Sequence, residues 1–469
     1  MQRKTKIIAT LGPAVADPDA IDRLVAAGMN VARLNFSHGD QDGHRRFLEW
    51  VRAASARHEV PVAVLQDIQG PRIRVGTFPE GSVTVEPGTR IELVPGEAEG
   101  TASRIHVAHL EKASLQPGAR ILVSDGLIVF EVEEWDGERA VALVVEGGEI
   151  LDHKGVAFPG IPIDVPIVSA KDEDDLAFGK EIGVDLVAAS FVSCGPDLAR
   201  VKELVPDTPV IAKIESTVGY HNLDGIIAEA HGIMVARGDL GVELSFESVP
   251  RAQLDILRRT NARARVSITA TEMLESMTHS PRPTRAEVTD VSTAVLAGTD
   301  AVMLSAETAV GKYPVRAVAA MDRICRDAES NPGFDGNAGV EFLEDEARFA
   351  SAVAQACVDA ASSLALSTVV VFTESGSTAR LISKYRPEAG IVAYTPHPDT
   401  YRRLALYRGV TPFMFATVDS TDEMMMHAER DLLARGIVEP GEGFVLAAGV
   451  PPNQKATTNV MRLANAGGT

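Results

Sequence analysis

Short aliphatic runs alternate with amphipathic segments from residue 6 to residue 329 of the chain. Eight of these runs predict buried strands, because they are short and rich in β-branched residues. They are Lys6–Thr10, Asn30–Asn35, Val62–Asp67, Val184–Ser190, Val210–Glu215, Gly232–Arg237, Val266–Thr271 and Ala301–Ser305. The segments between them have the apolar spacing of helices: Pro18–Ala27, Gly43–Arg57, Ala170–Glu181, Pro196–Leu204, Leu223–Ala230, Pro250–Ala264 and Thr284–Leu296. An eighth helix is expected after the last strand, from Pro314 to about Glu329. Eight repeats of a strand and a helix predict an α/β fold, a (βα)8 TIM barrel.

One interval, between Asp67 and Val184, is much longer than a single helix requires. Within it, short alternating runs are separated by turns that contain Pro-Gly, Asp-Gly or Gly-Gly pairs. The runs are Arg90–Val94, Arg120–Val123, Ile128–Val132 and Ala140–Val145. This pattern predicts a small β-barrel domain inserted at the rim where barrel active sites lie. The insertion could act as a lid over the site, or it could be passive.

A second alternation of strands and helices follows a linker-like segment at residues 331–338. Helices are expected at Phe342–Ser363, Ser377–Lys384, Asp399–Tyr407 and Ser420–Arg435, and strands at Thr368–Phe372, Ile391–Tyr394, Thr411–Phe415 and Gly443–Ala447. This predicts a C-terminal α/β domain with an open, mostly parallel sheet. The expected domains are therefore a catalytic barrel (1–74 and 167–333), an inserted lid (75–166) and a C-terminal domain (334–469).

The composition restricts the kinds of partner. The chain of 469 residues has 45 Lys and Arg against 65 Asp and Glu, a net charge of −20. This charge disfavours nucleic acid or an anionic membrane surface, so we expect neither as a partner. Cys194, Cys325 and Cys357 lack the spacing of a disulfide framework or zinc site, and no apolar run approaches the roughly 18 residues of a membrane span. With no signal-peptide pattern at the N-terminus, we expect a cytoplasmic location.

Polar residues collect at the C-terminal ends of the predicted strands, where a barrel places its chemistry. Lys213 and Glu215 differ by two positions and so point to the same side, and Asp239 follows the next strand, 24 residues after Glu215. One cation and two carboxylates at one rim suit a divalent metal with a phosphoryl or carboxylate substrate. Any one of them could be a salt-bridged rim residue, but their convergence favours a site.

Ten segments of the chain together resemble the pyruvate kinase family over essentially its whole length. In order, they are Thr5–Pro13, Gly28–Gly39, Asp67–Arg74, Lys154–Gly160, Ala189–Phe191, Lys213–Glu215, Ile233–Glu243, Thr271–Met277, Pro281–Glu287 and Met303–Thr308. The resemblance implies transfer of a phosphoryl group from phosphoenolpyruvate to ADP, giving pyruvate and ATP in glycolysis. It also implies a barrel, a β lid and a C-terminal α/β domain, which is the architecture that the pattern predicts independently.

The resemblance implies a role for each matching residue of the site. Glu215 and Asp239 would hold the divalent metal, Mg²⁺ or Mn²⁺, and Lys213 and Arg33 would bind the transferring phosphoryl group. Thr271 and the backbone of Gly238 and Asp239 would bind the substrate carboxylate. The nucleotide would meet Asn35, His38, Arg74 and Lys154, with Asp125 approaching its metal from the lid. Thr271, Ser305 and Glu307 are candidates for a water-linked proton route to the enolate.

The loop Gln69-Gly70-Pro71-Arg72 departs from the family pattern. Most family members that require potassium have an acid at the position of Arg72, and members with Lys there tend not to require it. A guanidinium can supply the charge that the ion would bring, so we predict full activity without added potassium. The family ligands of the monovalent ion are nonetheless all present: Asn35, Ser37, Asp67 and the carbonyl of Ile68.

A hydroxyl-rich loop in the third domain lies between a predicted strand and a predicted helix. It comprises Thr373, Glu374, Ser375, Gly376, Ser377 and Thr378. In the family this loop binds phosphorylated effectors, and free N–H groups at a helix start suit a phosphate. Glu374 favours AMP or a sugar monophosphate over a bisphosphate, and the late loop at residues 449–459 could close over it. The alternative is a plain helix cap.

Two other classes of function remain open beside a phosphotransferase. A lyase acting on phosphoenolpyruvate or pyruvate could share the carboxylates, but the lid and Lys213 argue against it. A metabolite sensor without catalysis is disfavoured because the cation and both carboxylates are intact. The expected small-molecule partners are phosphoenolpyruvate, ADP or ATP, and pyruvate, and the family expectation is a homotetramer.

Overall fold

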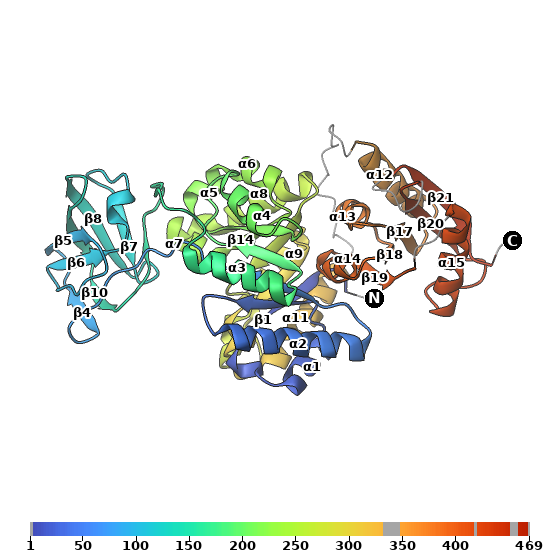
Figure 1. The fold of residues 1–469 in the computed structure, drawn as a ribbon, viewed down its shortest axis with the longest axis horizontal. Coiled ribbons are helices and arrows are strands. Elements are labelled where there is room, and N and C mark those ends of the chain that lie inside the picture. Colours follow the sequence, from blue (N-terminus) through green and yellow to red (C-terminus); the bar gives the residue numbers. More distant parts are fainter. Residues whose placement is uncertain (1–2, 332–347, 417–419, 451–457, 468–469) are drawn as a thin grey trace.

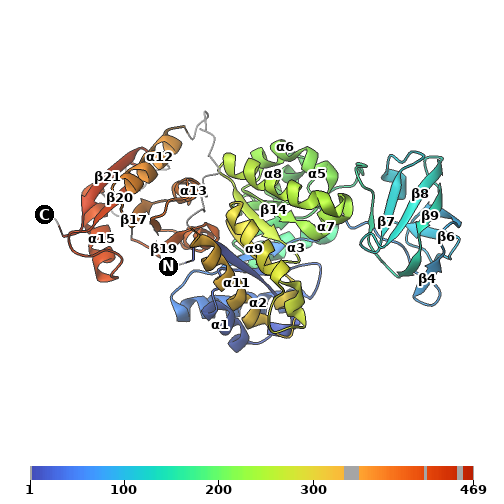
Figure 2. The ribbon, with the colours of Figure 1, turned by 180° about the vertical axis from the view of Figure 1, so that it is seen from behind.

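The computed structural model describes residues 3–331, 348–416, 420–450 and 458–467. Three bodies follow one another along its length, with a β-rich domain at one end, a barrel in the middle and an α/β domain at the other end (Figure 1). Figure 2 shows the same order from behind, with the C-terminal domain against the barrel on the side away from the β-rich domain.

All eight predicted strands form one closed parallel barrel. They are β1 (Lys6–Leu11), β2 (Val31–Asn35), β3 (Ala63–Asp67), β12 (Leu186–Ala189), β13 (Val210–Ile214), β14 (Gly232–Ala236), β15 (Val266–Ala270) and β16 (Ala301–Leu304). The order around the barrel is β1-β16-β15-β14-β13-β12-β3-β2. Each strand is almost fully buried because apolar side chains face both the interior and the helices.

The expected helices surround this barrel as α1 (Pro18–Ala26), α2 (Gln41–His58), α3 (Ala170–Ile182), α4 (Asp197–Leu204), α6 (Leu223–Glu229), α8 (Val249–Ala262), α9 (Arg285–Leu296) and α11 (Pro314–Glu329). Their starts follow from local sequence. Asp17 caps α1, and a capping box of Ser169 with Asp172 begins α3. Three short helices were not predicted: α5 (Thr217–His221), α7 (Arg237–Glu243) and α10 (Ala306–Ala309). Each follows a barrel strand at the rim.

The inserted domain contains a two-stranded and a six-stranded sheet. Its strands are β4 (Ser82–Val85), β5 (Arg90–Pro95), β6 (Arg104–Val107), β7 (Arg120–Val123), β8 (Ile128–Trp135), β9 (Ala140–Glu146), β10 (Gly148–Leu151) and β11 (Val156–Ala157). They enclose a separate apolar core that includes Leu93, Ile121 and Phe130. The four runs predicted as strands are confirmed.

The C-terminal domain has a five-stranded sheet in the order β19-β18-β17-β20-β21. Its strands are β17 (Thr368–Phe372), β18 (Gly390–Thr395), β19 (Val410–Met414), β20 (Gly443–Ala448) and β21 (Val460–Asn465). Its helices are α12 (Arg348–Ser363), α13 (Ser377–Lys384), α14 (Pro398–Arg403) and α15 (Thr421–Ala434). Antiparallel β21 was not predicted. Residues 332–338 of the expected linker and residues 342–347 of the expected first helix lie outside the described residues.

A buried ion pair joins the C-terminal domain to the N-terminal end of the barrel. Lys384, the last residue of α13, pairs with Asp300, which precedes β16, and both side chains are 2% exposed. Lys384 also donates to Asn261 at 2.7 Å, and Arg386 pairs with Asp300 at 3.3 Å. These contacts attach the domain to the end of the barrel opposite the lid. In the described part of the chain, no helix combines the length and apolar character of a membrane span.

Candidate active site

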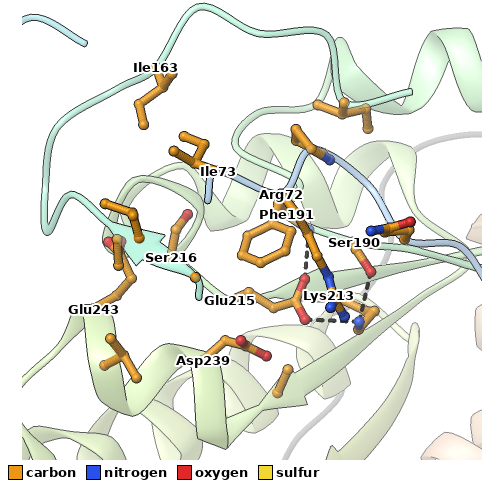
Figure 3. A pocket seen from close by; sticks show the side chains of 18 of the residues that line it. Arg72, Ile73, Ile163, Ser190, Phe191, Lys213, Glu215, Ser216, Asp239 and Glu243 are labelled. Carbon is orange, nitrogen blue, oxygen red and sulfur yellow. Dashed lines mark hydrogen bonds and ion pairs between the residues drawn. The ribbon is translucent and has the colours of Figure 1, made fainter. Parts of the chain in front are cut away.

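A cavity of about 490 Å³ lies at the C-terminal ends of the barrel strands, between the barrel and the lid. Most of the predicted site residues line it: Arg33, Asn35, Ser37, Asp67, Arg72, Arg74, Asp125, Lys154, Lys213, Glu215, Asp239 and Thr271. His38, Ile68, Gly238, Ser305 and Glu307 are not part of its wall. Figure 3 shows Lys213, Glu215 and Asp239 close together at the base, with Ile163 and Glu243 farther along the cavity.

Lys213 lies at the centre of a buried polar cluster. Its Nζ is 2.8 Å from Glu215 Oε1 and donates to Ser190 Oγ at 2.7 Å (Figure 3). The same Nζ lies 3.3 Å from Asp67 Oδ1. Lys213 belongs to β13 and Glu215 follows its last residue, so the strand's alternation places both in the cavity, as predicted. The cation therefore bridges carboxylates from two strands.

Arg33 provides a second cation on the other side of Asp67. Its Nε is 2.7 Å from Asp67 Oδ2, and its NH1 donates to Thr10 Oγ1 at 3.0 Å. The Arg33 side chain is 10% exposed, so its remaining donors face the cavity rather than bulk solvent. Arg33 and Lys213 thus present two positive groups to whatever anion occupies the base of the cavity.

The pKa shifts in this cluster show where charge is unbalanced. Burial raises the pKa of Glu215 to about 7; the Lys213 ammonium opposes this shift and the Asp239 carboxylate adds to it. Burial would lower the pKa of Lys213, but Asp67 and Glu215 outweigh it and raise that pKa. Burial would raise the pKa of Asp67, but Lys213 and Arg33 hold it below its usual value. Asp67 thus has two cations, whereas Glu215 shares one of them and faces a second carboxylate.

The excess of carboxylates over cations in this cluster indicates whether a divalent metal fits. The cluster has two cations, Arg33 and Lys213, and three carboxylates, Asp67, Glu215 and Asp239. Mg²⁺ and Mn²⁺ prefer carboxylate oxygens and usually keep other positions for water and substrate. Among the described residues no group of three or more His, Cys, Asp or Glu forms a self-contained metal site. Glu215 and Asp239, two carboxylates where positive charge is short, therefore fit a divalent metal.

The loop after β15 is held in an unusual backbone conformation beside the cavity. Thr271 and Glu272 have φ of 67° and 53°, in the left-handed region that costs energy for residues with a Cβ. Arg237 NH2 donates to the Thr271 carbonyl at 2.6 Å, and Arg237 in turn pairs with Asp290 at 2.6 Å. Gly238 N donates to Thr271 Oγ1 at 2.8 Å. The start of α7 and the Thr271 loop are thereby locked together, although sequence reasoning assigned no role to Arg237 or Asp290.

The opposite wall of the cavity is strongly positive. Arg72 and Arg74 come from the chain that enters the lid, and Lys154 from the chain that returns. Burial lowers the pKa of His38, and the charges of Arg72, Arg33 and Arg74 lower it further, which places His38 in the same positive field. Such a wall suits the phosphates of a nucleotide.

The oxygens predicted for a monovalent cation already have donors. Arg72 NH2 donates to Ser37 Oγ at 3.2 Å, Ser190 Oγ donates to the Ile68 carbonyl at 2.8 Å, and Asp67 has its two cations. Asn35 Oδ1 accepts from Ser37 N at 3.2 Å. The guanidinium of Arg72 therefore lies against one of these oxygens, Ser37 Oγ.

Ser305 and Glu307 form a support behind the cavity. The buried Glu307 carboxylate accepts from Ser305 N at 2.6 Å and from Leu274 N at 2.9 Å, which ties the loop after β16 to the loop after β15. Ser305 Oγ is buried and has no hydrogen-bond partner among the described residues.

Ser190 and Phe191 are site residues to which sequence reasoning gave no role. Ser190 Oγ links Lys213 to the Ile68 carbonyl, and Phe191 N donates to Glu215 Oε2 at 2.6 Å. Phe191 has φ of 55°, which aims its N–H at the carboxylate. The sequence feature that could have identified them is their position directly after the fourth strand, within a segment that resembles the family.

The predicted phosphate loop of the C-terminal domain lies at the start of α13. Gly376 N donates to Thr373 Oγ1 at 2.9 Å, and Ser375 Oγ donates to Ser377 Oγ at 3.1 Å. Glu374 pairs with His397 at 2.5 Å on the surface. Thr378 contacts the Thr458 hydroxyl, whereas residues 451–457 of the late loop lie outside the described residues.

A lidded barrel whose cavity combines two cations, three carboxylates and a positive wall is the arrangement of an enzyme that handles phosphorylated, metal-bound substrates. The family model for the pyruvate kinase barrel domain matches residues 2–318, and the model for the pyruvate kinase alpha/beta domain matches residues 351–464. The chain belongs to the pyruvate kinase family. It is a phosphotransferase acting between phosphoenolpyruvate and ADP, as predicted, and membership implies dependence on a divalent metal.

Individual relatives agree over nearly the whole chain. The pyruvate kinase of Clostridium perfringens is 39% identical over 98% of this chain and 99% of its own length. That of Corynebacterium glutamicum is 40% identical over 99% of this chain and 98% of its own. The crystal structure of a pyruvate kinase from Cryptosporidium parvum superposes with a TM-score of 0.93 at 34% identity, covering 99% of this chain and 96% of that one. The predicted fold and activity are confirmed.

Proposed function

We propose that the base of the cavity transfers the phosphoryl group of phosphoenolpyruvate to ADP in glycolysis, with Lys213 and Arg33 as the groups that bind it. The observation that carries this assignment is the position of Lys213 Nζ, buried between Glu215 and Asp67 and held by Ser190. Phosphoryl transfer spreads negative charge over the equatorial oxygens, and fixed cations in a buried site stabilise that charge.

Glu215 and Asp239 hold the divalent metal, Mg²⁺ or Mn²⁺. The shortage of positive charge around Glu215 supports this choice. When bound, the ion neutralises charge on the substrate oxygens. Phe191 N fixes the orientation of the Glu215 carboxylate, and Lys213 holds its other oxygen, so the carboxylate is oriented before the ion arrives.

Thr271, with the backbone of Gly238 and Asp239, binds the substrate carboxylate. The lock of Arg237 onto the Thr271 carbonyl supports this role, because a strained loop at a site needs such support. After transfer the enolate carbon needs a proton. We assign the route to Thr271, Ser305 and Glu307 with water. The buried Ser305 hydroxyl has no hydrogen-bond partner in the described part of the chain, which supports a water at that point.

The nucleotide phosphates lie against Asn35, His38, Arg74 and Lys154, and Asp125 reaches them from the lid. Arg74, Asp125 and Lys154 all line the wall between lid and barrel, which supports a site completed by lid closure.

The enzyme works without potassium. Four oxygen ligands would otherwise bind the ion, those of Asn35, Ser37, Asp67 and the Ile68 carbonyl. Arg72 donates to Ser37, and Lys213 and Arg33 pair with Asp67, which supports this proposal. A resident guanidinium supplies a permanent positive charge there.

A metabolite with one phosphate group, AMP or a sugar monophosphate, regulates the enzyme at the loop of residues 373–378. Hydroxyls of Thr373, Ser375 and Ser377 at the start of α13 support this, and the Glu374 carboxylate opposes a doubly phosphorylated ligand. Titration with AMP, ribose 5-phosphate and glucose 6-phosphate at subsaturating phosphoenolpyruvate tests the assignment. An unchanged half-saturation with all three contradicts it.

The protein forms a homotetramer in the cytoplasm, with domain boundaries at 1–74 and 167–333, 75–166, and 334–469. The free thiols of Cys194, Cys325 and Cys357 support a reducing compartment. Light scattering tests the tetramer.

One coupled assay tests the reaction itself. Pyruvate should form from phosphoenolpyruvate only when ADP and Mg²⁺ are both present. Pyruvate without ADP would indicate a lyase or phosphatase, and no turnover under any condition would indicate a sensor.

A further inference from the structure

Glu243, the last residue of α7, contacts three separate segments of the chain. Its carboxylate accepts from Thr217 N at 3.3 Å, and Glu243 lines the same cavity as Phe158 and Ile161. Burial raises the pKa of the Glu243 carboxyl, and the neighbouring backbone N–H groups of Thr217, Gly160 and Phe158 oppose that rise. Its own carbonyl accepts from Thr217 Oγ1 at 3.0 Å. One side chain therefore joins α7, the loop after β13 and the chain that returns from the lid.

Two of these segments belong to the base of the site. Helix α7 begins with Arg237, Gly238 and Asp239, and Thr217 lies two residues after Glu215. Both segments are held in place by local contacts, because Arg237 is paired with Asp290 and Ser216 caps the helix that begins at Thr217. Glu243 is thus anchored on the rigid side of the cavity.

The third segment belongs to the lid. Phe158-Pro159-Gly160-Ile161 forms a turn in which Ile161 N donates to the Phe158 carbonyl at 3.0 Å, with Gly160 at a φ of 74°, as in a type II turn. Phe158 is 2% exposed and packs in the lid's own core. The Glu243 side chain, on the same cavity wall as this turn, therefore faces the body of the lid and not a loose loop.

The returning chain is also paired with the chain that enters the lid. Val156 N donates to the Ile73 carbonyl, and Val75 N to the Lys154 carbonyl, both at 2.9 Å, while Arg74 forms a bridge with Gly155. The positions of Arg74 and Lys154, two cations of the positive wall, are consequently linked to the turn that Glu243 holds.

A second lid contact falls on the same helix end. A Cβ on Gly126, the residue after Asp125, would lie 3.8 Å from Val242 Cγ1. The tip of the lid and its returning chain therefore both meet α7 within its last two residues. Figure 3 shows Glu243 beside Ser216, on the side of the cavity away from Lys213.

We propose that Glu243 is a positioning residue that sets the lid, and with it the nucleotide-binding cations Arg74 and Lys154, relative to the base of the site. It acts through the Phe158–Gly160 turn and does not contact the reacting atoms. The inference rests on the proposed reaction, but it concerns only the nucleotide half of the cavity.

The experiment compares Glu243→Gln with Glu247→Gln, a matched change in an exposed acid four residues away. Glutamine has the shape of glutamate but brings an NH₂ group against backbone N–H donors. We expect the KM for ADP to rise about five- to tenfold, because charge-assisted hydrogen bonds are lost. The Kd of phosphoenolpyruvate, measured with Mn²⁺ and without ADP, should change less than about twofold.

Hydrogen exchange provides a second readout that does not depend on activity. Amides in peptides spanning residues 156–166 should exchange faster in Glu243→Gln, while peptides from β13 and β14 keep the wild-type rate. Glu247→Gln should match the wild type in both measurements. Unchanged exchange together with an unchanged KM for ADP overturns the proposal, and so does an equal loss of phosphoenolpyruvate binding, which would place Glu243 in the substrate site. Absence of wild-type turnover would instead refute the proposed function.

Discussion

Replacing Lys213 by methionine removes the central cation of the site while retaining a side chain of similar length. In the protein, Arg33 and Lys213 face Asp67, Glu215 and Asp239, so the cluster has two positive and three negative groups. The variant has one positive group against the same three carboxylates. The transferring phosphoryl group then meets a more negative cavity.

The size of the effect follows from the Coulomb attraction between Lys213 and a phosphoryl group bound beside it. Lys213 Nζ lies 2.8 Å from Glu215 Oε1, in the part of the cavity where the phosphoryl group is proposed to bind. Two unit charges about 4 Å apart at an effective dielectric constant of about 20 interact by about 4 kcal/mol. Since about 1.4 kcal/mol corresponds to tenfold in rate, Lys213→Met should lower kcat by about 10³-fold. Loss of the ammonium raises the pKa of Glu215 further, so Mn²⁺ should still bind to Glu215 and Asp239 but only at a higher pH than in the wild type.

Pyruvate formation coupled to NADH oxidation by lactate dehydrogenase measures kcat, and calorimetry measures the Mn²⁺ affinity. Lys202→Met is the matched control, because Lys202 pairs with Glu229 on the surface, where the side chains are 40% and 55% exposed. The control should have the wild-type kcat. Turnover of Lys213→Met within about tenfold of the wild type would refute the electrostatic reasoning.

Three further predictions follow from other parts of the chain. Activity should be complete without potassium, whereas Arg72→Glu should gain at least about tenfold on adding KCl at constant ionic strength; a large gain in the wild type would contradict the role of Arg72. Lys384→Met should destabilise the protein to urea by about 3–5 kcal/mol, because it leaves Asp300 buried with a weaker partner, against less than about 1 kcal/mol for Lys202→Met; equal effects would be inconsistent with a buried pair. The pKa of Glu215 is raised to about 7, so its protonated form is favoured in the metal-free protein below that pH and must lose its proton to bind a metal. The affinity for Mn²⁺ should therefore fall by up to about tenfold per pH unit below 7, and a flat profile between pH 6 and 8 would show that Glu215 is already ionised.

Much of the architecture could be predicted because its elements are locally encoded. The barrel strands are continuous apolar runs, and caps such as Asp17 and Ser169 mark where helices begin. Short elements escaped prediction. Helix α7 has only seven residues and starts inside the motif that ends the sixth strand, so its sequence pattern is too short to show a helical period. Strand β21 is an edge strand with several exposed residues, which gives it no clear apolar signal.

Part of the site could likewise be predicted from the sequence, and part could not. Parity along one strand was enough to place Lys213 and Glu215 together, because alternation is a local property of an extended chain. The contacts from Ser190 and Phe191 to these residues come from another strand, and a hydroxyl or a backbone N–H has no distinctive signal in the sequence. The hold of Arg237 and Asp290 on the Thr271 loop depends on long-range packing in the same way.

The sequence by itself determined the order of strands and helices, the presence of an inserted β domain, and the residue types at the strand ends, since all of these follow from periodicity and from motifs read along the chain. Only the tertiary structure decided that Asp67 has two cations while Glu215 shares one with it, that Arg72 lies against Ser37, and that Glu243 lines the same cavity as the lid residue Phe158. The physical reason is that charge balance and hydrogen bonding depend on distances of a few ångströms between distant parts of the chain, which are settled by packing and not by local pattern.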